Sequence, residues 1–116
     1  MKILIVDDSP VMRQTIKSIV ATPDDVTAEC DDGASVIAAF DAFHPDWVLM
    51  DVKMSRTNGL EATRQLKAVH PDSHVAIVTN YGDQEFRDEA RAAGADVYFL
   101  KDNLPAIRRQ LEAFSY

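Results

Sequence analysis

Residues 47–61 read WVLMDVKMSRTNGLE, and this stretch decides the fold that we predict for the chain. Its first four residues are apolar and form the short run that is typical of a strand buried on both faces. A carboxylate, Asp51, follows directly, and a polar loop that contains Asn58 and Gly59 comes next. Because an isolated buried carboxylate is costly unless it is paired, the rest of the sequence should supply partners for Asp51.

The composition is that of an ordinary soluble globular domain: the chain has 116 residues, 47% of them hydrophobic and 27% charged. We therefore expect one domain, residues 1–116. A net charge of −7 argues against direct binding to nucleic acid, because phosphate backbones require a basic face. The single cysteine, Cys30, excludes an internal disulfide and suits a cytoplasmic location. No apolar run approaches the length of a membrane span.

Short apolar runs alternate along the chain with longer segments of helical periodicity. The predicted strands are residues 3–6, 26–30, 47–50, 75–78 and 97–100. Ser9-Pro10 before the first helix and Gly94 after the fourth are typical of helix boundaries. Alternating β-α units of this kind predict an α/β doubly wound fold, with a parallel five-stranded sheet and helices on both faces.

Charged and hydroxyl side chains follow most of the predicted strands. They are Asp7 and Asp8 after the first strand, Asp51 after the third, Thr79 after the fourth and Lys101 after the fifth. Because ligands of open α/β sheets bind outside the carboxyl ends of the strands, we expect these side chains to share one edge of the sheet. Each alone has an ordinary explanation as a cap, a turn residue or a solvated charge, but the set indicates a functional site.

The carboxylates in this set require a compensating cation. Two carboxylates about 4 Å apart repel each other by roughly 4 kcal/mol at an effective dielectric constant near 20. Lys101 supplies one positive charge, and Mg²⁺, which prefers carboxylate, water and phosphate oxygens, would supply two more. The pattern therefore predicts that Asp51 lies in an acidic Mg²⁺-binding pocket, where a carboxylate can act as a nucleophile toward phosphorus.

Four parts of the chain resemble the receiver domain of bacterial two-component response regulators, and the resemblance covers essentially all of its length. They are ILIVDDS at 3–9, WVLMDVKM with NGLE at 47–54 and 58–61, VAIVTN at 75–80, and AGADVYFLKD at 93–102. Their order, spacing and strand context agree with that family. The resemblance implies a flavodoxin-like fold with the strand order 2-1-3-4-5.

For the site, the resemblance implies that Asp51 accepts a phosphoryl group from a phosphohistidine on a sensor histidine kinase or a phosphotransfer protein. Asp8, Asp51 and the backbone carbonyl of Lys53 would bind Mg²⁺ directly, and Asp7 would bind it through water. Lys101 would pair with Asp51 and then with the phosphoryl oxygens. The domain would catalyse its own phosphorylation and dephosphorylation and turn over no external substrate.

The resemblance also implies a switch. Thr79 would bond the phosphoryl group and draw its loop inward, and Tyr98 would turn from an exposed to a buried position. This would change the surface formed by the fourth helix, fifth strand and fifth helix. A downstream protein or an output domain would recognise the changed surface, and a homodimer could form through it. Lys53, Asn80 and Tyr81 occupy positions that would tune access to the phosphoryl group and its lifetime.

Three residues depart from the family pattern: Ser55 and Asp102 stand where proline is common, and Asn80 stands where a small residue is typical. Loss of proline frees the loop after the third strand, although Gly59 still shapes it. A cis bond that does not precede proline costs about 3 kcal/mol, which favours a trans Lys101–Asp102 bond. These departures leave open an alternative function, a receiver-like protein-binding module that does not respond to phosphorylation.

Two other functions of this architecture are disfavoured. An aspartyl-nucleophile phosphatase would carry a second aspartate at the position of Lys53, and a flavin site would need a phosphate-binding loop after the first strand. The sequence YFLKD at 98–102 is typical of receivers that are linked to a helix-turn-helix output domain. We therefore interpret the chain as a stand-alone or an excised receiver.

Two remaining features receive ordinary interpretations. Pro71 separates His70 from His74, so we interpret both histidines as solvated loop residues and not as metal ligands. The basic pair Arg108-Arg109 is interpreted as part of a solvated helix face.

Overall fold

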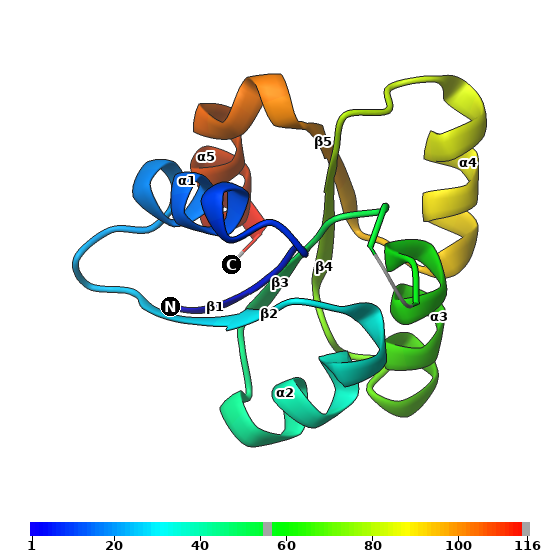
Figure 1. The fold of residues 1–116 in the computed structure, drawn as a ribbon, viewed down its shortest axis with the longest axis horizontal. Coiled ribbons are helices and arrows are strands. Elements are labelled where there is room, and N and C mark those ends of the chain that lie inside the picture. Colours follow the sequence, from blue (N-terminus) through cyan, green and yellow to red (C-terminus); the bar gives the residue numbers. More distant parts are fainter. Residues whose placement is uncertain (55–56, 115–116) are drawn as a thin grey trace.

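The structure, a computed structural model, describes residues 1–54 and 57–114 and alternates strands with helices throughout (Figure 1). The strands are β1 (Lys2–Val6), β2 (Val26–Cys30), β3 (Trp47–Met50), β4 (Val75–Thr79) and β5 (Val97–Leu100). The helices are α1 (Pro10–Val20), α2 (Val36–Phe43), α3 (Gly59–Val69), α4 (Gln84–Ala93) and α5 (Leu104–Phe114). Two short 3-10 turns, η1 (Gly33–Ser35) and η2 (Lys101–Asn103), precede α2 and α5.

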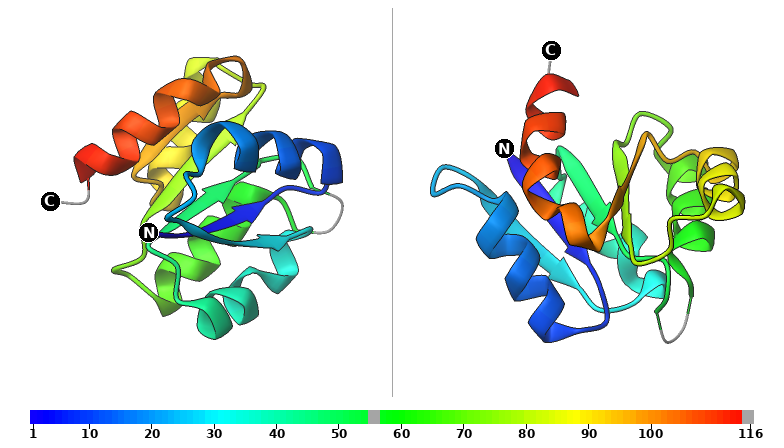
Figure 2. Two further views of the ribbon diagram at one scale, coloured as in Figure 1. Left: turned by 90° about the vertical axis from the view of Figure 1, so that its left-hand side faces the viewer. Right: turned by 90° about the horizontal axis from the view of Figure 1, so that it is seen from above.

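The sheet is parallel and has the order β2-β1-β3-β4-β5, which confirms the predicted fold class and strand order. Helices α1 and α5 cover one face of the sheet, and α2, α3 and α4 cover the other (Figures 1 and 2). All helices described in the chain therefore lie outside a single central sheet, and the connections between strands cross over its faces.

Strand β3, the stretch that decides the fold, is buried along its whole length. Its side chains alternate between the faces of the sheet: Val48 and Met50 pack into the core under α2, α3 and α4, whereas Trp47 and Leu49 pack under α1 and α5. Such alternation is a geometric property of strands, and it explains why a strand covered on both faces reads as a continuous apolar run.

The predicted helix boundaries at Ser9-Pro10 and Gly94 are confirmed. The Ser9 hydroxyl accepts a hydrogen bond from the Met12 amide, and Pro10 is the first residue of α1. Gly94 ends α4 with a φ of 104°, a left-handed conformation that glycine adopts without a steric penalty.

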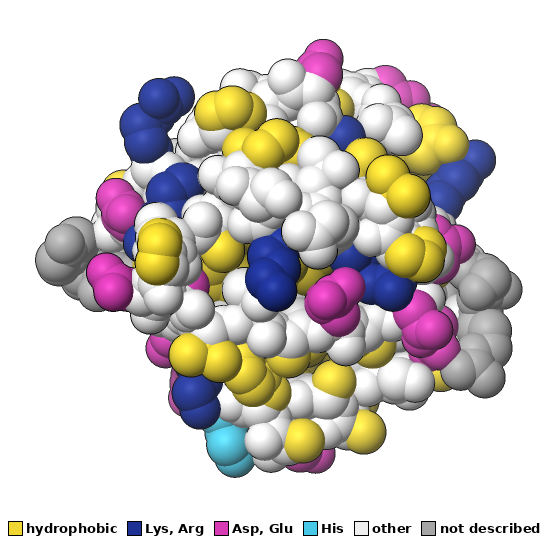
Figure 3. Space-filling model, turned by 60° about the vertical axis from the view of Figure 1, so that its left-hand side comes forward, with side chains coloured by type: hydrophobic (Ala, Val, Ile, Leu, Met, Phe, Trp, Pro, Cys, Tyr) yellow, Lys and Arg dark blue, Asp and Glu magenta, His cyan; other side chains and the backbone are white. Residues whose placement is uncertain are grey.

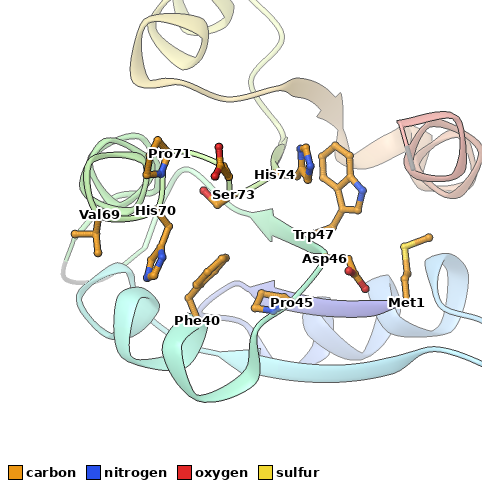
Figure 4. A pocket seen from close by; sticks show the side chains of 11 residues that line it. Met1, Phe40, Pro45, Asp46, Trp47, Val69, His70, Pro71, Ser73 and His74 are labelled. Carbon is orange, nitrogen blue, oxygen red and sulfur yellow. The ribbon is translucent and has the colours of Figure 1, made fainter. Parts of the chain in front are cut away.

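A groove of about 740 Å³ lies at the amino ends of the strands, between the segments that lead into β3 and β4 (Figure 4). His70 and His74 both line it, and His70 is partly exposed, as expected of a loop histidine, but it also has partners that the sequence did not indicate. Its Nε2 lies 2.6 Å from Oδ1 of Asp41 on α2, and its ring centroid lies 4.5 Å from that of Phe40. His74 is exposed, with its ring 5.2 Å from the ring of Trp47.

Charges of both signs are mixed on the face shown in Figure 3, where Lys and Arg side chains lie among Asp and Glu side chains. This face therefore lacks the continuous basic surface that a nucleic-acid backbone would require. None of the helices in residues 1–54 and 57–114 has both the length and the apolar character needed to span a bilayer.

Arg108 ties α5 to the loop between α1 and β2, which corrects our interpretation of it as a solvated residue. Its guanidinium bonds the carboxylate of Asp25, of which only 1% is exposed, and lies 2.7 Å from Glu112. Burial alone would raise the pKa of Asp25, but hydrogen bonds from the Met1 ammonium and the Thr22 amide, together with the charge of Arg108, lower it from 3.8 to about 2.

We predict that Asp25→Asn lowers the free energy of unfolding at pH 7 by roughly 1–3 kcal/mol, because the buried carboxylate of Asp25 loses its charge and with it the ion pairs to the Met1 ammonium and Arg108. The pKa of Asp25 is lower in the folded state, so its contribution is fully present above about pH 4 and is lost as the pH falls toward 2. Denaturant unfolding of both proteins across this range measures the difference. Asp24→Asn, a change at the exposed neighbour, is the matched control, and a difference that does not shrink at low pH would contradict the prediction.

Candidate functional site

Asp7 and Asp51 lie side by side at the carboxyl edge of the sheet because β1 and β3 are paired neighbours. The backbone keeps both residues in register: the Asp7 amide donates to the Cys30 carbonyl at 3.1 Å, and the Asp51 amide donates to the Val6 carbonyl at 2.9 Å. Both residues are buried, with exposed fractions of 1% and 7%. Two carboxylates of limited solvent access therefore face the same small volume.

Lys101 supplies the positive charge between them. Its Nζ lies 3.0 Å from Oδ2 of Asp7 and 3.2 Å from Oδ1 of Asp51. Burial works to lower the pKa of Lys101, but the hydrogen bond and charge of Asp7 and the charge of Asp51 outweigh it, so that the pKa is raised. Lys101 is therefore held in its charged form, and it links the end of β5 to the ends of β1 and β3.

The surroundings of Asp51 raise the pKa of its carboxyl group. Burial and, next, the negative charge of Asp7 raise its pKa from 3.8 to about 6, although the contact with Lys101 opposes the shift. The contact with Lys101 thus does not outweigh burial and the charge of Asp7. A further cation would remove this penalty.

Asp7, Asp8 and Asp51 form a group whose oxygen atoms can all lie within 4.8 Å of one another. Asp8 is exposed, so the group opens to solvent on one side. Oδ2 of Asp7 is buried and forms an ion pair with Nζ of Lys101, 3.0 Å away. A cluster of three carboxylates that is buried on one side and open to solvent on the other fits Mg²⁺, a hard cation that binds oxygen.

Gly59, the first residue of α3, packs against the backbone of Asp51 and Val52. Its amide donates to the Val52 carbonyl at 2.8 Å, and a Cβ atom at this position would lie 1.8 Å from the carbonyl oxygen of Asp51. The Asn58 side chain caps the same helix by accepting from the Glu61 amide. The sequence assigned Gly59 a role in shaping the loop, but it did not indicate this close approach to Asp51, which depends on how α3 packs against the end of β3.

Tyr81 joins the predicted switch residues to one another. Its amide donates to the Thr79 hydroxyl at 3.3 Å, and its carbonyl accepts a hydrogen bond from the Tyr98 hydroxyl. Its ring stacks on Phe86 of α4 at 5.2 Å, and Nζ of Lys53 lies 4.8 Å from the ring centroid. Two of the predicted tuning residues, Lys53 and Tyr81, are therefore in direct contact, whereas the third, Asn80, is exposed.

Tyr98 is half-buried and faces the core under α2, α3 and α4, whereas its neighbour Phe99 faces the opposite core, as strand alternation predicted. The Arg87 guanidinium lies 4.7 Å from the centroid of the Tyr98 ring. Burial raises the pKa of the Tyr98 hydroxyl. In this structure Tyr98 is thus already bonded to the loop that follows Thr79.

The structure describes the departure from the family pattern at Asp102 but not the one at Ser55. The Lys101–Asp102 bond is trans, since none of the described peptide bonds is cis. Ser55 lies outside the described residues, so its predicted effect on the loop stays a prediction.

We predict that Asp51→Asn stabilises the metal-free protein at pH 7.5 by roughly 1–3 kcal/mol. The pKa of Asp51 is higher in the folded state, so its charged form destabilises the fold fully above about pH 6 and not at all below its ordinary value of 3.8. The advantage of the variant should therefore fade between pH 6 and pH 4. Unfolding in the presence of EDTA measures it, with Asp72→Asn at the opposite edge as control; a gain that does not depend on pH would contradict the electrostatic explanation.

Comparison with known proteins agrees with this geometry. Residues 3–112 match the family described as the response regulator receiver domain. A transcriptional regulatory protein of Bacillus subtilis, YhcZ, is 37% identical over 107 residues, which are 90% of this chain and 50% of that protein. The chemotaxis protein CheY of Listeria monocytogenes is 36% identical over 102 residues, which are 87% of this chain and 86% of that protein.

A solved structure of a two-component response regulator of the LuxR family from Aurantimonas superposes with a TM-score of 0.90 at 28% identity, covering 97% of this chain and 83% of that one. The chain spans about half the length of the transcriptional regulatory relatives that it matches. With a family match over nearly its whole length and the acidic edge described above, the chain belongs to the receiver domains of two-component response regulators.

Proposed function

We propose that this phospho-accepting receiver domain, residues 1–116, uses Asp51 as its phosphoacceptor, with a phosphohistidine of a sensor histidine kinase or a phosphotransfer protein as the donor. The observation that carries this proposal is the buried carboxylate of Asp51 at the end of β3, 3.2 Å from Nζ of Lys101 and next to two further carboxylates. Its position allows an incoming phosphoryl group to meet a nucleophile and positive charge together.

In the transfer, a carboxylate oxygen of Asp51 forms a bond to phosphorus while the bond from phosphorus to the donor imidazole nitrogen breaks. The imidazole takes the bonding electron pair and leaves, and Asp51 becomes an acyl phosphate. Lys101, which contacts both buried carboxylates, neutralises charge on the phosphoryl oxygens. Catalysis of this kind consists mainly of positioning and electrostatic stabilisation.

Mg²⁺ is the cofactor that fits the acidic cluster. Asp8, Asp51 and the backbone carbonyl of Lys53 would hold the ion directly, and Asp7 would hold it through water. When bound, Mg²⁺ supplies positive charge to the phosphoryl oxygens and offsets repulsion among the carboxylates. The closeness of the three carboxylates and the raised pKa of Asp51 support this assignment.

The response travels from Thr79 through Tyr81 to Tyr98. The Thr79 hydroxyl turns to bond the phosphoryl group, and the loop moves with it because the Tyr81 amide is bonded to that hydroxyl. The Tyr81 carbonyl holds the Tyr98 hydroxyl, so the same movement changes the position of Tyr98 on β5. The surface of α4, β5 and α5 then shifts between two populations and is recognised by a downstream protein, an output domain or a second copy of the chain.

The alternative, a receiver-like module that binds a protein without responding to phosphorylation, is not favoured. Such a module needs no buried acidic cluster with a compensating lysine, yet the chain retains both. Signalling of this kind takes place in the cytoplasm, and we propose that location for the domain.

We predict that acetyl phosphate with Mg²⁺ adds one phosphoryl group to the protein, and that Asp51→Ala abolishes the adduct because it removes the nucleophile. Intact-mass spectrometry and native electrophoresis detect the adduct, which should be labile, as acyl phosphates are. Asp72→Ala, a change at an exposed carboxylate on the opposite edge, should leave it intact. An adduct that persists in Asp51→Ala would place the acceptor elsewhere; no adduct from acetyl phosphate or from a phosphorylated kinase would favour the binding module.

We predict that Lys53→Ala speeds dephosphorylation by about 2- to 5-fold and leaves phosphorylation intact. Lys53 follows the acceptor by two residues, and its ammonium lies 4.8 Å from the centroid of the Tyr81 ring. We propose that its long side chain hinders the approach of water to the acyl phosphate; a change of about 0.5–1 kcal/mol in the barrier corresponds to this change in rate. The decay of the phosphorylated protein after removal of the donor measures the rate. Tyr81→Phe keeps the ring and should decay like the wild type; equal rates for Lys53→Ala and the wild type would show that Lys53 does not affect the lifetime.

A further inference from the structure

We propose that Arg13 is a positioning residue that orients Asp8, the exposed ligand of the proposed Mg²⁺ site, by holding the peptide group between Asp7 and Asp8. The inference rests on the proposed function and assigns a role to a residue that the sequence did not single out. It is based on the contacts that Arg13 makes with two other elements and on the planarity of the peptide bond.

The side chain of Arg13, only 16% exposed, reaches from α1 to the end of β1 and to β2. Its Nη1 donates to the carbonyl oxygen of Asp7 at 2.7 Å, and its Nε donates to Oε1 of Glu29 at 2.8 Å. The two bonds use different nitrogen atoms of one rigid, planar guanidinium. Glu29 therefore sets the direction of the guanidinium, and the guanidinium sets the direction of the Asp7 carbonyl.

The Asp7 carbonyl and the Asp8 amide belong to the same rigid planar group. A donor that fixes the carbonyl therefore fixes the direction in which the chain continues to the Cα atom of Asp8. The carboxylate of Asp7 is held independently, by the Ser9 amide at 2.9 Å and by Lys101. Asp8 is exposed, and the described part of the chain gives its carboxylate no hydrogen bond, so its orientation depends on the backbone that precedes it.

Positioning and charge predict opposite effects when Arg13 is replaced. As a cation near an acidic cluster, Arg13 repels Mg²⁺, and loss of its charge alone would tighten Mg²⁺ binding. As a clamp on the peptide group before Asp8, Arg13 favours Mg²⁺ binding, and its loss would weaken it. The sign of the change therefore separates the two roles.

The conservative variant sharpens this distinction. Lysine keeps the positive charge but presents a single ammonium, which does not reproduce the fork that bonds Asp7 and Glu29 together. Arg13→Lys should therefore lose most of the affinity that Arg13→Met loses. Glu29→Gln, which weakens the contact that sets the direction of the guanidinium, should have a smaller effect in the same direction.

The test is a calorimetric titration of the full chain with Mg²⁺ at fixed ionic strength, for the wild type and for these three variants. We expect Arg13→Met to weaken Mg²⁺ binding about tenfold, the lower end of the range for residues that orient metal ligands. Lys17→Met is the matched control, because it removes one exposed positive charge from the same helix. It should change the affinity by less than about twofold, since exposed charges are screened.

A second measurement does not require the metal. In metal-free protein, Arg13→Met should speed hydrogen exchange of the Asp8 amide, which belongs to the peptide group that Arg13 holds, more than exchange of amides within β4. A purely structural role would speed exchange at both places alike. Melting temperatures of the variants show whether they are folded under the conditions of the titration.

Mg²⁺ binding by Arg13→Met that equals or exceeds that of the wild type would overturn the inference and leave the proposed function intact. Weakened binding by both Arg13 variants, with Lys17→Met unchanged, would support it. Failure of the wild type to bind Mg²⁺ or to form an adduct at Asp51 would instead overturn the proposed function, and the assignment of Asp8 as a ligand with it.

Discussion

The ion pairs that Lys101 forms with Asp7 and Asp51 are the constraint on which the carboxyl edge of the sheet depends. They bring together residues from the ends of β1, β3 and β5, and they place opposite charges where solvent access is limited. The balance is incomplete, because burial and the charge of Asp7 keep the pKa of Asp51 raised despite the contact with Lys101. The same imbalance costs stability in the metal-free protein, and the cation that we propose for the site would relieve it.

Much of this arrangement follows from the sequence, because it depends on rules that act along the chain. The apolar run at β3, followed at once by Asp51, indicates a buried strand with a carboxylate at its end. Parallel strands bring their carboxyl ends to one edge, so the meeting of Asp7, Asp51 and Lys101 could be predicted from their positions after three predicted strands. The caps at Ser9 and Gly94 are equally local, and the structure agrees with both.

The sequence did not predict the contacts between side chains that are distant in the chain and carry no local pattern. His70 pairs with Asp41 because α2 and α3 pack side by side, and Arg108 reaches Asp25 because α5 crosses the loop after α1. Arg13 was not noticed for the same reason: its partners are a backbone carbonyl and a glutamate on an edge strand. In each case the three-dimensional packing, and not a spacing of residues, decides which polar groups meet.

The backbone and the side chain of Tyr81 make different sets of contacts. Both hydrogen bonds that connect it to Thr79 and Tyr98 are made by its backbone, whereas its side chain makes the contacts with Lys53 and Phe86. A substitution at position 81 can therefore change the ring without removing the backbone groups that join Thr79 to Tyr98, the two proposed switch residues. For the proposed switch, the duration of a signal and its transmission would then be separable traits: evolution could adjust the first by changing one side chain while the main chain preserves the second.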